Sequence, residues 1–114
     1  MNTEAHIKSS CLKYLAKQGI TAWNNPSGAV RIAPERWLHF GKKGSSDILG
    51  ILPKGRFLAV EVKAPRGRLT PEQKQFLDDV QKLGGLAVVV RSWKELDHVL
   101  RETGYVTAGP LFEG

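Results

Sequence analysis

The spacing of apolar residues along the chain predicts three helices, and the first lies at the N-terminus. Thr3 is a suitable cap for a helix that runs to about Lys17. Apolar side chains recur in it at intervals of four residues, which is the spacing of one buried helical stripe: Ile7, Cys11 and Leu15. We therefore expect one face of this helix to pack on the core.

The second and third helices have clear start signals. Thr70-Pro71-Glu72-Gln73 combines a threonine cap, proline at the first helical position and glutamine at the third. Its apolar face is predicted to hold Phe76, Leu77, Val80 and Leu83, before Gly84-Gly85 ends the helix. Ser92 is predicted to cap the third helix, which continues through about Leu100.

Apolar runs between these helices predict strands. Asp47–Leu52 and Arg56–Lys63 flank the turn sequence Pro53-Lys54-Gly55 and are typical of a β-hairpin. Leu86–Val90 is wholly apolar, as expected for a strand buried on both faces, and a helix joins it to the hairpin, so that pairing should be parallel. In residues 21–40, short extended pieces around Val30 and Leu38 flank a turn signal at Ala33-Pro34, and we expect an irregular, loop-rich segment with at most one strand. The pattern indicates an α/β sandwich with a mixed central β-sheet flanked by helices.

Length and composition restrict the class of protein further. The 114 residues suit one domain, which we place at 1–104, with 105–114 as a C-terminal tail of little pattern. The single cysteine, Cys11, excludes an internal disulfide. The longest apolar stretch, Leu86–Val90, is too short to span a membrane, and no secretion signal precedes it. We therefore expect a soluble, cytoplasmic protein with no membrane partner.

The charge balance points to a nucleic-acid partner. Seventeen Lys and Arg against eleven Asp and Glu give a net charge of +6. Neutralising phosphates releases counterions, so basic surfaces favour DNA, although a merely solvated positive face is the alternative. The excess is concentrated between residues 31 and 68, where the candidate phosphate contacts are Arg36, Lys42, Lys43, Arg66 and Arg68. Tryptophans are more often core than stacking platforms; Trp37, beside Arg36, is the candidate for a DNA contact.

Three residues of the predicted hairpin suggest chemistry. Glu61 and Lys63 are two apart on a strand and so share one face. If the connecting loop has three residues, Asp47 lies directly opposite Glu61; an even loop would send it to the other face. Two carboxylates that close repel unless a cation lies between them, and a hard ion such as Mg²⁺ prefers oxygen ligands. The backbone carbonyl of Val62 could complete the coordination.

A metal at that position would support hydrolysis of phosphodiesters. It would polarise the phosphate, hold a water for attack and offset charge on the leaving oxygen. Lys63, on the same face, could stabilise the transition state or help to deprotonate the water. The pattern of an acid and a lysine two residues apart is common by chance, so the prediction depends on the parity of the hairpin loop.

These motifs resemble those of a known family. Ser46-Asp47, the hairpin and Glu61-Val62-Lys63 are similar to the PD-(D/E)xK nuclease superfamily. The segments 44–50, 69–75 and 84–92 resemble its VRR-NUC (virus-type replication-repair nuclease) branch, and the likeness runs from Glu4 to about Leu100. The chain departs from the superfamily at Ser46, where proline is frequent.

The resemblance carries further expectations. It implies a restriction-endonuclease-like fold with an α-β-β-β-α-β core, Mg²⁺ or Mn²⁺ as cofactor, and two more site residues, with Glu4 as a ligand and Gln73 as a catalytic group. Both have structural readings, since Glu4 suits the first turn of a helix and Gln73 suits a capping box.

Compact members of the branch resemble phage and bacterial enzymes that cut branched DNA, including four-way junctions, as homodimers. We therefore expect this chain to act in a bacterial or phage-infected cell. A flap or linear-duplex nuclease, or a non-catalytic DNA-binding module, is the alternative.

Overall fold

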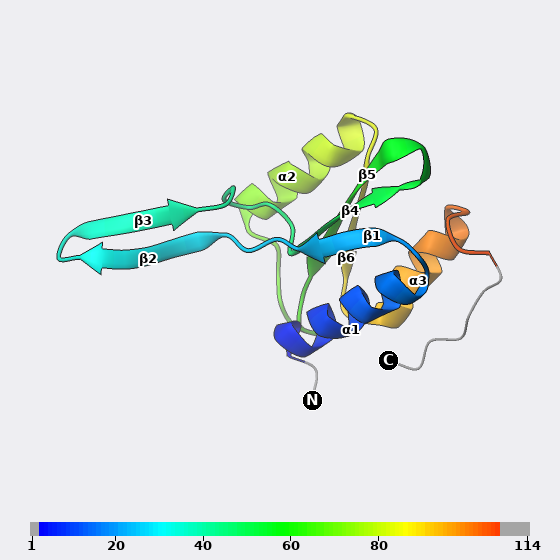
Figure 1. Ribbon diagram of the computed structural model, residues 1–114, viewed down its shortest axis with the longest axis horizontal. Coiled ribbons are helices and arrows are strands. Elements are labelled where there is room, and N and C mark those ends of the chain that lie inside the picture. Colours follow the sequence, from blue (N-terminus) through cyan, green and yellow to red (C-terminus); the bar gives the residue numbers. More distant parts are fainter. Residues whose placement is uncertain (1–2, 108–114) are drawn as a thin grey trace.

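The computed structural model describes residues 3–107, in which helices cover both faces of a four-stranded sheet (Figure 1). The elements are α1 (Glu4–Lys17), β1 (Thr21–Asn24), β2 (Gly28–Ala33), β3 (Arg36–Phe40), β4 (Ile48–Leu52), β5 (Arg56–Val62), α2 (Pro71–Lys82), β6 (Leu86–Val90) and α3 (Trp93–Glu102). The sheet has the order β1-β4-β5-β6, with antiparallel pairs except for the parallel pair β5–β6. The predicted mixed sheet is therefore confirmed.

Side-chain alternation along β4 and β5 divides the core into two layers. Ile48, Leu58 and Val60 are fully buried on the face that packs against α1 and α3. On the opposite face, Ala59 packs against Leu77 of α2 in a smaller apolar cluster. Because successive strand residues point to opposite sides, the residues that flank Val60 and Val62 belong to the α2 side.

The helix boundaries agree with the sequence signals. Thr3 Oγ1 accepts a hydrogen bond from the His6 amide, and Thr70 and Gln73 form both bonds of a capping box. Leu83 was wrongly assigned to the apolar face of α2: it is 86% exposed, because it lies beyond the last helical residue. The prediction that the last strand is buried on both faces was also wrong, since Val89 is exposed on the edge strand β6.

The largest error concerns residues 21–40, which form three strands instead of an irregular segment. β1 joins the edge of the main sheet beside β4. β2 and β3 pair with each other as a two-stranded ribbon, here called the arm, that projects from the domain (Figure 1). Every position of the arm except Ala33 is exposed, so neither face of the arm is buried, although apolar and polar residues alternate along it.

The folded unit continues past the predicted boundary at residue 104. The amides of Tyr105 and Val106 donate to the Leu100 carbonyl, and Val106 is buried in the core. The remainder of the predicted tail, 108–114, lies outside the described residues. In residues 3–107 no helix has the length and apolar character needed to cross a membrane.

Candidate active site

The β4–β5 hairpin has the parity that an active site requires. A short 3₁₀ turn at Pro53–Gly55 connects the strands, with Lys54 and Gly55 at positive φ. Leu52 lies opposite Arg56, and the register continues to Ile48 opposite Val60. The loop therefore has three residues, and the same register sets Asp47 beside Glu61 at the end of the hairpin.

Asp47 is held in place from two sides. Its Oδ2 accepts a hydrogen bond of 2.9 Å from the Val62 amide, which ties the carboxylate to β5. Its carbonyl accepts from the Asn25 amide at 2.7 Å, and the Asn25 side chain donates to Ser45 Oγ and to the Ser46 carbonyl. Asn25 thus positions the segment that carries Asp47. The sequence showed Asn25 only as part of a turn signal, and no local pattern indicates these contacts.

The segment before Asp47 is packed closely. Ser46 is fully buried, and its hydroxyl has no hydrogen-bond partner within residues 3–107. Gly44 has a φ of +83°, and a Cβ there would lie 2.6 Å from the carbonyl of Glu72. Only glycine suits this approach to the first turn of α2. The short distance couples the Asp47 loop to the start of α2.

Glu61 is a buried acid in an unfavourable environment. It is 2% exposed, and Lys63 Nζ lies 3.6 Å from its Oε2. Its Oε1 is buried without a hydrogen-bond partner in the described part of the chain. Burial, followed by the neighbouring Asp47 carboxylate, raises the pKa of Glu61 to about 8, and Lys63 only partly opposes this. A positive ion would relieve both the repulsion and the unsatisfied oxygen.

The donor set suits a hard divalent cation. The two carboxylates of Asp47 and Glu61 and the Val62 carbonyl can provide oxygen ligands at one end of the hairpin. Mg²⁺ commonly binds through one or two carboxylates and keeps several waters, so it does not need a larger protein cage. Residues 3–107 contain no group of three or more His, Cys, Asp or Glu arranged to hold a metal. The site therefore rests on the carboxylate pair.

The two site residues implied only by the family resemblance, Glu4 and Gln73, lie in different settings from the carboxylate pair. Glu4 is exposed in the first turn of α1, and it is not gathered with Asp47 and Glu61 into a metal-binding group. The Gln73 side chain accepts a hydrogen bond of 3.0 Å from the Thr70 amide, which is the structural role considered above. Their catalytic roles stay predictions.

Basic residues surround the loop that follows Lys63. Arg66 and Arg68 line a hollow of about 450 Å³ together with Arg91. The Arg91 guanidinium is fixed by a 2.7 Å hydrogen bond to the Ala64 carbonyl. Arg91 was missed from the sequence because it follows β6, far from Lys63 along the chain. The parallel β5–β6 pair brings the two strand ends together.

The other predicted phosphate contacts are more dispersed. Lys42 and Lys43 lie exposed between the arm and the Asp47 segment, and Lys43 forms a 3.6 Å ion pair with Glu72. Arg36 is exposed at the start of β3. Two of the three tryptophans are not core residues, since Trp23 is 44% and Trp37 58% exposed, whereas Trp93 stacks on Tyr14.

The mixed sheet, with the β4–β5 hairpin and the crossover helix α2, has a restriction-endonuclease-like architecture. The chain belongs to the VRR-NUC family: the family model for the VRR-NUC domain matches residues 26–94. It is also similar to a solved structure described as a VRR_NUC domain, with 25% identity and a TM-score of 0.63 over 90% of this chain and 97% of that chain. Among curated proteins, none matches. The predicted family and fold class are thus confirmed.

Proposed function

We propose that this protein is a Mg²⁺- or Mn²⁺-dependent DNA endonuclease whose active site is formed by Asp47, Glu61 and Lys63. The observation that carries the proposal is the buried Glu61 carboxylate, which lies beside Asp47 with one oxygen unsatisfied. A structural role alone leaves this arrangement unexplained, because two adjacent buried acids are unfavourable in a fold and Lys63, 3.6 Å from Glu61, only partly offsets them. Membership of a nuclease family supports the same reading.

Each residue has a distinct task. Asp47, Glu61 and the Val62 carbonyl would hold the metal, which when bound polarises the phosphodiester and activates water. The Val62 amide orients Asp47 through the 2.9 Å hydrogen bond. Lys63 Nζ, close to Glu61, can donate a hydrogen bond to a phosphoryl oxygen and stabilise its developing charge. Glu4 and Gln73 remain candidate additions to this set.

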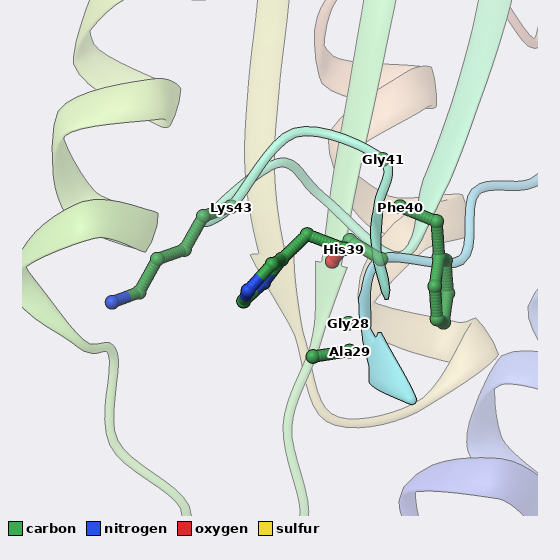
Figure 2. Close-up of a pocket in the computed structure, with 7 residues that line it drawn as sticks. Gly28, Ala29, His39, Phe40, Gly41 and Lys43 are labelled. Atoms are coloured by element: carbon green, nitrogen blue, oxygen red, sulfur yellow. The ribbon is translucent and has the colours of Figure 1, made fainter. Parts of the chain in front are cut away.

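We expect DNA to contact basic residues at two places, the loop after Lys63 and the arm. Arg66, Arg68 and Arg91 offer guanidinium groups to the phosphates next to the site. On the arm, Arg31 lies opposite Trp37, and both side chains share the face of His39. Figure 2 shows His39 and Lys43 on the opposite side of the arm from Phe40. A basic and aromatic face of this kind suits a nucleic-acid backbone and its bases. Lys42 and Arg36 are further candidate contacts.

The substrate class follows from the likeness to compact members of the family. We propose a homodimer that cuts branched DNA, with four-way junctions as the main candidate, in the bacterial or phage-infected cytoplasm. One site per small domain makes two copies necessary for paired cuts. Selectivity for a flap or a linear duplex is the competing proposal within the same class.

A side-by-side cleavage assay tests the activity and the substrate together. With Mg²⁺, we expect a labelled four-way junction to be cut at least about tenfold faster than a linear duplex of the same sequence. Excess EDTA should abolish all cleavage, and added Mn²⁺ should restore it. A faster reaction on a flap would replace the junction assignment. Tight DNA binding without cleavage in either metal would identify a non-catalytic module.

A further inference from the structure

The arm has one strongly apolar face. Val30 lies opposite Leu38, and Gly28 lies opposite Phe40, whose ring would contact a Cβ on that glycine at 3.2 Å. Ile32, at the bulge between Arg31 and Ala33, is also exposed and adds apolar surface near the tip of the arm. These residues are defined here as the arm's apolar face: Val30, Ile32, Leu38 and Phe40. All four are between 44% and 53% exposed.

Such a face is unusual on an isolated ribbon. Within residues 3–107, β2 and β3 pair only with each other, and the arm contributes to a longest dimension of 54 Å. Two strands alone are marginally stable in water. Four half-exposed apolar side chains present a patch on the order of 300 Å², the size at which exposed apolar surface marks an interaction site. We therefore expect a binding partner to cover the arm's apolar face.

A second apolar surface lies beside α2. A groove of about 370 Å³ is lined by Phe57, Phe76, Val80, Leu83 and Gly85, with Lys42 and Asp79 as its charged residues. Ile51 pairs with Phe57 and extends the surface over β4, and Trp23 extends it over β1. Ile51, Trp23, Phe57 and Leu83 are all at least 40% exposed. This surface, called the α2 groove below, exists because α2 packs on β5 and β6 and leaves β1 and β4 open on that side.

We propose that the arm's apolar face docks in the α2 groove of a second copy of this chain. The arm of the second copy docks in the α2 groove of the first in the same way. DNA is a poor occupant of the arm's apolar face, because aliphatic side chains offer phosphates no hydrogen-bond donor. A contact between two arms would leave the groove uncovered. Reciprocal docking covers both surfaces and closes with twofold symmetry.

The size of the two surfaces agrees with this arrangement. Two contacts, each covering a patch of a few hundred Å² on both partners, reach the roughly 1,000 Å² that a specific interface requires. Arg36 and Glu35 lie near the tip of the arm, and Asp79 and Lys42 line the groove. Residues of opposite sign are thus available on both sides. The inference does not depend on nuclease activity.

Sedimentation velocity across a range of concentrations tests the interface. We expect the wild-type chain to be a dimer at micromolar concentration. Leu38→Glu in the arm and Leu83→Glu in the groove should each weaken self-association at least 100-fold. Both positions are outside the buried core, so circular dichroism should remain unchanged. Trp37→Glu, next to Leu38 but on the opposite face of the arm, is the matched control and should stay dimeric.

Mixing the two variants distinguishes the arrangement from other dimers. The Leu83→Glu chain keeps an intact arm, and the Leu38→Glu chain keeps an intact groove, so the mixture should regain heterodimers held by one of the two contacts. An arm-to-arm dimer would give no recovery and would overturn the proposal. A wild-type chain that stays monomeric at 100-fold higher concentration would overturn it too. So would a Leu38→Glu variant that stays dimeric but loses affinity for duplex DNA.

Discussion

Asp47→Asn will lower the rate of Mg²⁺-dependent DNA cleavage by at least about 10³-fold, because a metal contributes several kcal/mol to such a transition state. The substituted amide oxygen can still accept the 2.9 Å hydrogen bond from Val62, so the hairpin should remain folded. Single-turnover cleavage of a labelled junction gives the rate, and circular dichroism verifies the fold. The effect then reports the lost negative charge.

The matched control for this experiment is Asp78→Asn. Asp78 is an exposed acid on α2 that is not part of the carboxylate pair, and its variant should cleave like the wild type. Lys63→Met should lose about 10²–10³-fold, as for removal of a single donor to a developing charge. If the Asp47→Asn protein cleaves within a few-fold of the control, the assignment of the active site is wrong.

Mg²⁺ at saturation will raise the melting temperature of the wild-type protein by about 5–10 °C at pH 8.5, since binding to the native state alone stabilises it. The pKa of Glu61 is raised from 4.5 to about 8 in the metal-free fold. The unfolded chain therefore loses this proton at lower pH than the native state does. Metal-free stability should fall as pH rises from 4.5 to 8, by up to a few kcal/mol. Mg²⁺ binds the ionised form, so its effect should shrink at pH 6.

Glu61→Gln separates the effect of the Glu61 charge on stability from the effect of Mg²⁺ binding. The amide is neutral, so this variant should melt above the wild type in EDTA at pH 8.5 and should no longer respond to Mg²⁺. Differential scanning calorimetry in EDTA and in Mg²⁺, with Asp78→Asn as control, measures both effects. An equal Mg²⁺ response in wild type and Glu61→Gln would show that the ion binds elsewhere.

The geometry of the hairpin could be predicted because it depends on local rules. Alternation along β5 sets Glu61 and Lys63 on one face, and the three-residue turn at Pro53–Gly55 fixes the parity that brings Asp47 beside them. The start of α2 could be predicted equally well, since the capping signal at Thr70 acts within four residues. Such features need no knowledge of the tertiary structure.

The remaining features depend on contacts between distant segments. Asn25 positions the Asp47 loop from 20 or more residues away, and Arg91 reaches the Ala64 carbonyl only because β5 and β6 are parallel neighbours. The arm was not predicted as two paired strands for a different reason: its strands are short and exposed, and the turn signals at residues 24–28 and at Ala33-Pro34 dominate the segment. The extended pieces around Val30 and Leu38 were recognised, but their pairing with each other was not predicted.

The most direct test of the carboxylate pair as a metal-dependent nuclease site is the position of a bound ion in a crystal. Crystals grown with Mn²⁺ and the Lys63→Met protein, which should cleave DNA slowly, can be measured at the manganese absorption edge. The proposed site predicts an anomalous peak within ligand distance of the carboxylates of both Asp47 and Glu61. A peak only at other residues, in crystals of a protein whose wild type is active in Mn²⁺, would contradict it.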